Sequence, residues 1–335
     1  MFIVQNYSLA VVLCFITMFC WGSWGNTQKM AAKSWRYELF YWDYVLGILF
    51  FSLVLGFTLG SIGSEGRSFI TDIRQVSSSN FWSAFGGGII FNASNILLAA
   101  AISISGMSVA FPLGVGFALV LGVFINYFTA PRGNPYLLFI GVFAIVIAII
   151  FNGMASGKMK KAGENSTANK GIWIAVSAGI LMSLFYRLVA AAMDLTNLSS
   201  PAAGKATPYT AFFIFTLGIL ASNFLFNTIV MKKPFVGEPV RYSEYLRGSP
   251  ATHLVGVLGG IIWGIGTSLS YLAAGKAGPA ISYGLGQGAT MVAAFWGVFV
   301  WKEFKGAARN INALLLLMFI LFSGGLVLII FSGAN

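Results

Sequence analysis

Long apolar runs, separated by short polar, proline-containing or glycine- and serine-rich segments, make up most of the chain. Each run has about 20 residues, the length that an α-helix needs to cross the hydrocarbon core of a bilayer. The pattern therefore predicts an all-α integral membrane protein with ten transmembrane helices, at residues 8–28, 39–60, 80–104, 107–129, 135–155, 171–193, 208–231, 252–275, 279–301 and 311–332. Pro135, Pro208 and Pro279 fall at or near the first turn of a predicted helix, where a missing N–H costs no hydrogen bond.

The composition agrees with a membrane protein. Of the 335 residues, 58% are apolar and only 9% are charged, whereas soluble domains carry about 25% charged residues. The ten spans leave no room for a separate soluble domain, so the bundle itself must carry the function. The net charge of +11 comes from short basic clusters between apolar runs. Such clusters are typical of orientation signals, and nucleic acid is therefore excluded as a partner.

The distribution of basic residues predicts the orientation. Fourteen of the 20 Lys and Arg residues lie in one alternate set of connections and five in the other. Because cytoplasmic loops carry the excess of positive charge, the richer set is predicted to be cytoplasmic and both termini are predicted to lie outside.

A shift of 172 residues superimposes the chain on itself. It aligns residues 87–90 with 259–262, both Gly-Gly-Ile-Ile, and continues into the next helix; with a one-residue adjustment, residues 46–49 of the preceding helix also align, with 217–220. Chance alignment of glycine-rich sequences is the alternative, but one near-constant offset serves three helices. The interpretation is two five-helix repeats, 1–156 and 171–335, joined by a short basic cytoplasmic linker, 157–170. Because five is odd, the repeats are inverted, as in secondary transporters with a binding site at the membrane midplane.

Polar and aromatic residues at mid-depth of the predicted helices are the candidates for solute binding. Intramembrane polar groups are costly and tend to face a cavity or one another. Aromatic rings stack on a sugar or a flat heterocycle, and amides bind its polar groups. For each amide, an ordinary interhelical hydrogen bond is the alternative. The predicted substrate-binding set is Trp21, Asn92, Asn95, Trp263, Thr267, Tyr271, Tyr283 and Gln287.

Charged and helix-bending residues complete the predicted mechanism. Asp43 lies about one turn inside the second helix, among aromatic residues, and is the candidate proton carrier, with Lys29 as its partner. A purely structural bridge between these two residues is the alternative. Small residues and proline allow helices to approach and bend. The predicted gating or pathway residues are Arg187, Pro112, Gly114, Gly116, Gly286 and Gly288.

The sequence argues against an enzyme. His253 is the only histidine, so zinc chemistry of the His-Glu-x-x-His type is impossible, and there is no Walker A lysine for an ATP-driven pump. No cofactor or metal site is expected. An ion or solute gradient remains as the energy source, with protons and a small solute as partners in a lipid bilayer. A receptor that binds without transporting is the rival class.

Several motifs resemble the drug/metabolite transporter superfamily. They are Cys-Trp-Gly-Ser-Trp at 20–24, Ser-Gly-Met-Ser at 105–108 and the stretch from Trp296 to Phe304. More narrowly, the chain resembles the bacterial glucose/ribose and rhamnose-proton porters and the plant ureide permeases. Trp42-Asp43-Tyr44 and residues 209–213 are most similar to the ureide permeases.

The resemblance implies a proton-coupled importer of a small neutral polar solute. A monosaccharide such as rhamnose, ribose or glucose ranks first, a ureide or nucleobase second, and export of drug-like amphiphiles third. Ureide permeases carry a long insertion between the fifth and sixth helices. The short linker here therefore implies a protein of the bacterial inner membrane.

Overall fold

The computed structural model describes residues 1–32, 34–159 and 165–334, and these residues are almost entirely helical. Nine helices of the described part are long and apolar enough to cross a membrane. These nine are α1 (Tyr7–Ala31), α2 (Tyr37–Phe57), α4 (Ser78–Ser105), α5 (Met107–Thr129), α6 (Pro135–Met159), α7 (Asn165–Ala192), α8 (Pro208–Lys232), α10 (Pro250–Ala277) and α13 (Arg309–Ser332). The all-α integral membrane fold is confirmed.

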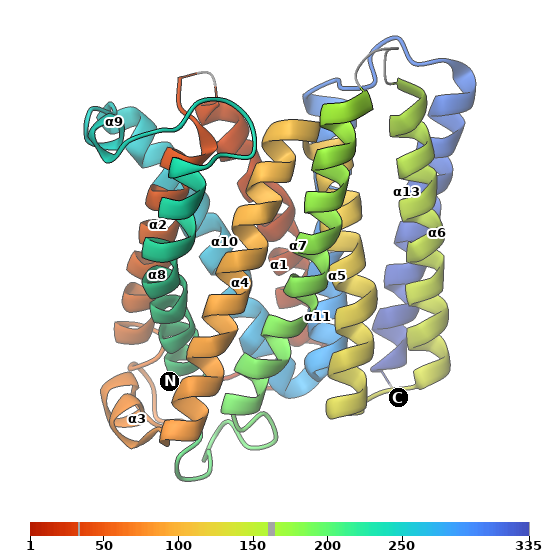
Figure 1. The fold of residues 1–335 in the computed structure, drawn as a ribbon. Coiled ribbons are helices and arrows are strands. Elements are labelled where there is room, and N and C mark those ends of the chain that lie inside the picture. The colour runs from red at the N-terminus through yellow and green to blue at the C-terminus, as the bar shows by residue number, and fades with distance from the viewer. Residues whose placement is uncertain (33, 160–164, 335) are drawn as a thin grey trace.

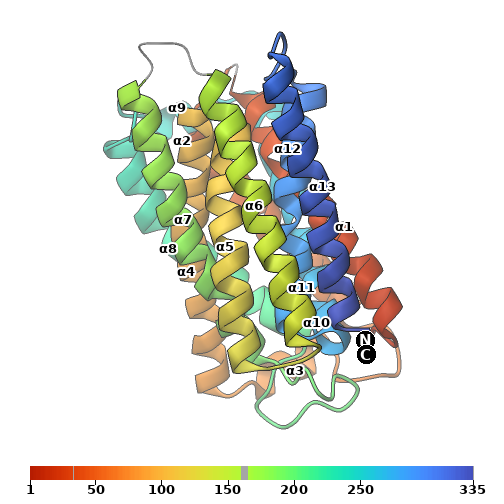
Figure 2. The same ribbon diagram turned by 90° about the vertical axis from the view of Figure 1, so that its right-hand side faces the viewer.

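The run predicted as a single span at 279–301 is divided. It forms α11 (Pro279–Gln287), α12 (Ala289–Phe295) and the π-helix η1 (Trp296–Val300), so the count of ten continuous spans is not reached in the described residues. At the break, the Gly288 N–H bonds to the Leu285 carbonyl, 3.0 Å away and three residues back instead of four. This tighter turn interrupts the α-helix. In Figure 2, α11 and α12 follow one another along the bundle.

Both termini and the short helix α3 (Phe69–Gln75) lie at the same end of the bundle, as Figure 1 shows. This end is called the terminal end. The other short helix, α9 (Tyr242–Leu246), lies at the opposite end, called the α9 end. Of the predicted linker 157–170, residues 160–164 lie outside the described residues, and the remainder belongs to α6 and α7.

Helices at the same position in the two halves make corresponding contacts. Helix α1 packs against α10, and its counterpart α7 packs against α4. In the same way α2 packs against α10, and its counterpart α8 packs against α4. Helix α6 packs against its counterpart α13 at one edge of the bundle (Figure 1). This is the pairing that two similar five-helix units would give.

Glycines 172 residues apart repeat the same local structure. Gly106, between α4 and α5, has φ +79°, and Gly278, between α10 and α11, has φ +82°. Residues other than glycine rarely adopt a positive φ. Gly88 and Gly260 also correspond: a Cβ at Gly88 would meet the Phe215 carbonyl of α8, and one at Gly260 would meet the Tyr44 carbonyl of α2. The repeat in sequence therefore coincides with a repeat in helix crossings.

Candidate functional site

A small cavity of about 20 Å³ lies at the centre of the bundle. Four of the eight residues predicted to bind solute line it: Trp21 of α1, Asn95 of α4, Trp263 of α10 and Gln287 of α11. Most of the remaining wall is apolar or aromatic and includes Phe111 and Phe185.

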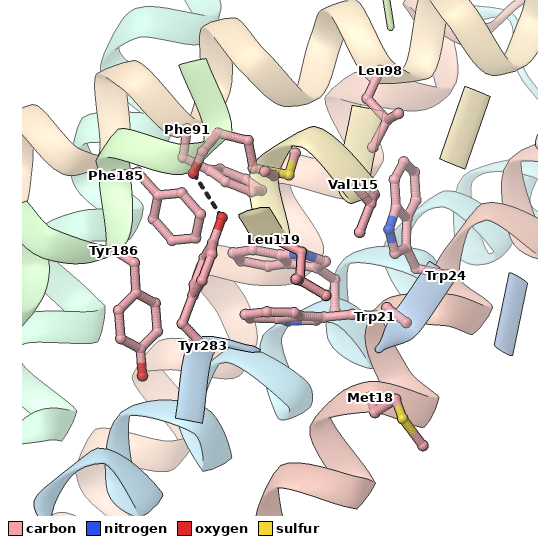
Figure 3. Close-up of a cluster of buried hydrophobic side chains, with 14 of the residues drawn as sticks. Met18, Trp21, Trp24, Phe91, Leu98, Val115, Leu119, Phe185, Tyr186 and Tyr283 are labelled. Atoms are coloured by element: carbon pink, nitrogen blue, oxygen red, sulfur yellow. Dashed lines mark hydrogen bonds between the residues drawn. The ribbon is translucent and has the colours of Figure 1, made fainter. Parts of the chain in front are cut away.

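Stacked aromatic rings form one wall of this cavity. The rings of Trp21 and Trp263 are stacked with centroids 6.3 Å apart and planes at 12°. Phe91 lies 4.3 Å from Trp263, and Tyr283 meets Trp21 edge-on at 6.5 Å. Figure 3 shows Trp21, Phe91 and Tyr283 in one cluster of packed side chains; the predicted residue Tyr283 belongs to this cluster but does not line the cavity. Trp21 Nε1 donates to Thr267 Oγ1 at 3.0 Å, so Thr267 orients the indole.

The two asparagines of α4 have different surroundings. Tyr41 Oη donates to Asn92 Oδ1 (3.1 Å) and accepts from Asn95 Nδ2 (3.2 Å), while Asn92 Nδ2 donates to Ser222 Oγ (3.0 Å). Asn92 thus joins α2, α4 and α8 by interhelical hydrogen bonds, and Asn95 lies at the cavity. Tyr41 is not among the residues predicted from the sequence to form the site, although it lies two residues before Asp43.

A buried cluster of hydroxyl groups closes the bundle on the terminal side of the cavity. Tyr186 Oη lies 3.0 Å from Ser270 Oγ and 3.3 Å from Ser282 Oγ, and Ser282 Oγ donates to the Ser270 carbonyl at 2.7 Å. These three residues, on α7, α10 and α11, are called the tyrosine–serine cluster. The predicted residue Tyr271 packs on Tyr186, with ring centroids 5.2 Å apart. Tyr271 therefore belongs to this closure and does not line the cavity.

Asp43 is buried where α2, α9 and α10 meet. Its Oδ1 accepts from Tyr245 Oη at 2.7 Å, and its Oδ2 lies 2.9 Å from His253 Nδ1. Burial and the Asp43 carboxylate raise the pKa of Tyr245 above its ordinary value, so this phenol stays protonated and donates. A Cβ at Gly256 would lie 2.5 Å from Asp43 Cβ, so the close approach of α2 and α10 here requires glycine.

The expected pairing of Lys29 with Asp43 is wrong. Lys29 Nζ instead lies 2.5 Å from Glu303 Oε1 and 4.5 Å from the centroid of the Trp301 ring. The reason is that α1 packs mainly against α10 and α12, which directs Lys29 to the segment after η1. The true partner of Asp43, His253, is 210 residues away in sequence.

The predicted gating residues lie at several places. Arg187 is exposed on α7 and does not line the cavity. Pro112 lines a separate cavity beside Leu113 and Ile149. Gly286 packs directly on the site, since a Cβ there would lie 2.8 Å from Trp21 Cζ3.

The other predicted glycines are packing positions. A Cβ at Gly114 would lie 3.0 Å from Leu98 Cδ1, and one at Gly116 would lie 2.5 Å from Ile149 Cδ1. Gly288 is the position at which α11 ends.

The structure is a bundle of helices long and apolar enough to span a membrane, with a buried aromatic and amide cavity at its centre. The family model of the ureide permeases matches residues 40–170 and 156–332. The chain therefore belongs to the ureide permease family, and it is a transporter, not an enzyme.

Proteins of similar sequence are found in plants and in bacteria. Ureide permease 1 of Arabidopsis thaliana is 24% identical, over 96% of this chain and 96% of its own. Glucose uptake protein GlcU of Bacillus subtilis is 25% identical, over 78% of each chain. A crystal structure with 14% identity matches with a TM-score of 0.61 over 97% of this chain and 96% of that one, which is a likeness of fold. The resemblance to plant ureide permeases and bacterial sugar uptake proteins is confirmed.

Proposed function

We propose that the protein imports a small neutral polar solute together with protons, by alternating access, and that a monosaccharide such as rhamnose, ribose or glucose is the first candidate. The observation that carries this proposal is the central cavity, where the stacked Trp21 and Trp263 stand beside the amides of Asn95 and Gln287. An indole face packs on the C–H face of a sugar ring, and amides bind its hydroxyl groups. A neutral solute is favoured because no charged side chain lines this cavity among the described residues.

The size of the cavity and its surroundings support the proposal of alternating access. A volume of about 20 Å³ is that of a water site, so a monosaccharide enters only if the lining helices move. On the terminal side the tyrosine–serine cluster closes the path. The break at Gly288, in a segment that touches the site, supplies a bending point for such movement. We propose that the α9 end, which carries most of the basic residues, faces the cytoplasm.

Proton coupling is proposed to use Asp43, with His253 and Tyr245 as its partners. A buried carboxylate is costly unless it is paired, and Asp43 is 2% exposed. Protonation of Asp43 removes its charge and weakens its attraction to His253. The contact between α2 and α10 would therefore respond to the protonation of this carboxyl group.

Replacement of Asp43 by asparagine tests the coupling. Asparagine still accepts a hydrogen bond from Tyr245 but cannot gain or lose a proton at physiological pH. We expect Asp43→Asn in sealed proteoliposomes to lose accumulation driven by a pH gradient while it retains solute exchange at equal pH. Labelled solute inside the vesicles is the measurement.

The matched control is Glu65→Gln, which also removes one carboxylate charge but from an exposed loop. This control should accumulate solute like the wild type. Unchanged proton dependence in Asp43→Asn would show that the carrier is another group.

A ureide or nucleobase is the second candidate solute. It is favoured by the relatives named ureide permeases, such as ureide permease 1, which matches over 96% of each chain. A flat heterocycle would use the same indole platform and the same amides. Thermal-shift measurements of the purified protein against sugars, ureides and nucleobases separate the two, because a ligand that binds only the native state raises its apparent stability.

A further inference from the structure

His253 connects the buried carboxyl group of Asp43 with the surface of the protein. It lies near the start of α10, which follows α9 in the chain. The Asp43 side chain is only 3% exposed, whereas that of His253 is 28% exposed. Nδ1 of His253 lies 3.0 Å from Asp43 Oδ1 and 2.9 Å from Oδ2. Both are hydrogen-bond distances, so a proton can pass between the two side chains without a bridging molecule.

Two aromatic rings hold the imidazole in place. The ring of Trp35 meets it edge-on with centroids 4.6 Å apart, and that of Tyr245 meets it edge-on at 4.9 Å. A Cβ at Gly248 would lie 2.8 Å from His253 Nε2, so the glycine leaves space beside the second ring nitrogen. Among the described residues, none bonds to Nε2. This nitrogen is therefore free to bond to water.

Two titratable groups of the described residues contact the imidazole: Asp43 from α2 and Tyr245 from α9. Burial and the Asp43 carboxylate raise the pKa of Tyr245, so the phenol keeps its proton and does not carry one. Asp43 does not line the central cavity. Of the groups that bond to Asp43, imidazole is the one that gains and loses protons near neutral pH. The route that the described residues offer from Asp43 to water therefore runs through His253.

We propose that His253 relays the proton between Asp43 and water at the α9 end. This inference rests on the proposed function, in which His253 is only the charged partner of Asp43. The protonated carboxyl group gives its proton to Nδ1 of the neutral imidazole, and the imidazolium then releases its Nε2 proton to water. The O–H bond of Asp43 breaks, an N–H bond forms at Nδ1, and the N–H bond at Nε2 breaks.

The relay is reversible, and its net result is one proton in water and a carboxylate on Asp43. The neutral ring then holds its proton on Nδ1. It returns to the first tautomer by exchange with water when the contact between α2 and α10 opens. A relay changes how fast the proton moves but not how many protons accompany each solute molecule. Loss of His253 is therefore expected to slow coupled transport without uncoupling it.

Replacement of His253 by alanine tests the relay, because it removes the imidazole and leaves space for a soluble one. His253 is the only histidine, so the variant has no other imidazole. A neutral solute that enters with a proton carries one positive charge, and an inside-negative potassium diffusion potential therefore drives its uptake into proteoliposomes at equal pH. The probes are labelled glucose and labelled allantoin. A pH-sensitive dye inside the vesicles records the protons.

We expect His253→Ala to take up the probe at least about 10-fold more slowly, as loss of a proton-transfer group predicts, and to reach the wild-type level of accumulation. Imidazole equilibrated on both sides of the membrane should restore the rate. Pyrazole has the same size but stays neutral, so it should not. His253→Gln keeps a hydrogen-bonding side chain that cannot carry a proton, and it should be as slow as the alanine variant.

The matched control is Leu254→Ala, which shortens the next side chain of α10, at a position that is 66% exposed. It should take up the probe at the wild-type rate. Wild-type rates in His253→Ala and His253→Gln would overturn the relay and leave the proposed function standing. A slow rate that pyrazole restores as well as imidazole does, or that neither restores, would also overturn the relay. Uptake of a probe without proton movement in the wild type would overturn the relay and the proposed proton coupling together.

Discussion

At the residue scale, a substitution at Gln287 tests the proposed solute binding with less effect on packing than a substitution at Trp263. Its side chain lines the central cavity, whereas Trp263 packs on Trp21, Phe91 and Phe215. Gln287→Leu keeps the volume and removes the amide. We expect solute affinity about 3- to 10-fold weaker, the cost of one lost hydrogen bond, with little change in melting temperature.

Trp263→Ala is the contrasting variant, because it should cost about 3 to 5 kcal/mol of stability as well as affinity. Titration calorimetry and thermal unfolding of both variants are the measurements. Wild-type affinity in Gln287→Leu would remove Gln287 from the site.

The sequence predicted part of the site because depth along a straight helix can be counted. Trp21, Asn95, Trp263 and Gln287 were selected by that count and line one cavity. Met182 and Phe185 also line it, but an apolar side chain in an apolar helix carries no signal that separates it from ordinary packing. That Trp21, Asn95, Trp263 and Gln287 bind solute stays a prediction. The partner of Asp43 was missed because long-range contacts are not encoded in local spacing.

At the element scale, helix crossings depend on particular glycines. Gly88 lies where α4 crosses α8, and a Cβ there would meet the Phe215 carbonyl and would lie 2.9 Å from Ile219 N. Backbone atoms cannot move aside as a flexible side chain can. We therefore expect Gly88→Ala to destabilise the protein by about 1 to 3 kcal/mol through overpacking.

The matched control is Gly86→Ala on the same helix, where a Cβ would meet nothing within 4 Å. This control should unfold at the wild-type temperature or above, because alanine favours helix more than glycine does. Thermal unfolding in detergent measures both variants. Equal melting temperatures for the two variants would contradict the proposed role of the crossing.

Helix positions were predictable to within a few residues wherever an apolar run ends in polar residues or proline. The break at Gly288 was not predictable in this way, because residues 279–301 form a continuous apolar run rich in glycine. The short helices α3 and α9 were missed because they lack the length and hydropathy of a span. Local turn geometry, which hydropathy does not record, decides these three features.

At the scale of the whole molecule, the two ends of the bundle differ. The tyrosine–serine cluster fills the terminal side, while a cavity of about 610 Å³ opens at the α9 end. Tyr186→Phe removes the hydroxyl that lies within 3.3 Å of both Ser270 Oγ and Ser282 Oγ. At about 1 kcal/mol for each hydrogen bond, we expect a several-fold shift toward a form open at the terminal end.

Labelling of Cys14 measures this shift. Cys14 is buried, and its Sγ lies 3.7 Å from Ser282 Oγ. In a Cys20→Ala background, a polar maleimide should react with Cys14 faster in Tyr186→Phe than in the parent, and the control Tyr136→Phe, at an exposed position on α6, should react at the parental rate. An unchanged rate in Tyr186→Phe would mean that the cluster does not hold this side closed.

The position of both termini at one end of the bundle has a practical consequence. Ala334, near the end of the chain, is exposed, whereas Met1 is buried and its amino group donates to the Glu65 carbonyl. An affinity handle added after the last residue would be displayed on one surface only. In vesicles that hold one molecule each, capture on a resin would then select a single orientation, and flux through each mouth of the transporter would be recorded separately.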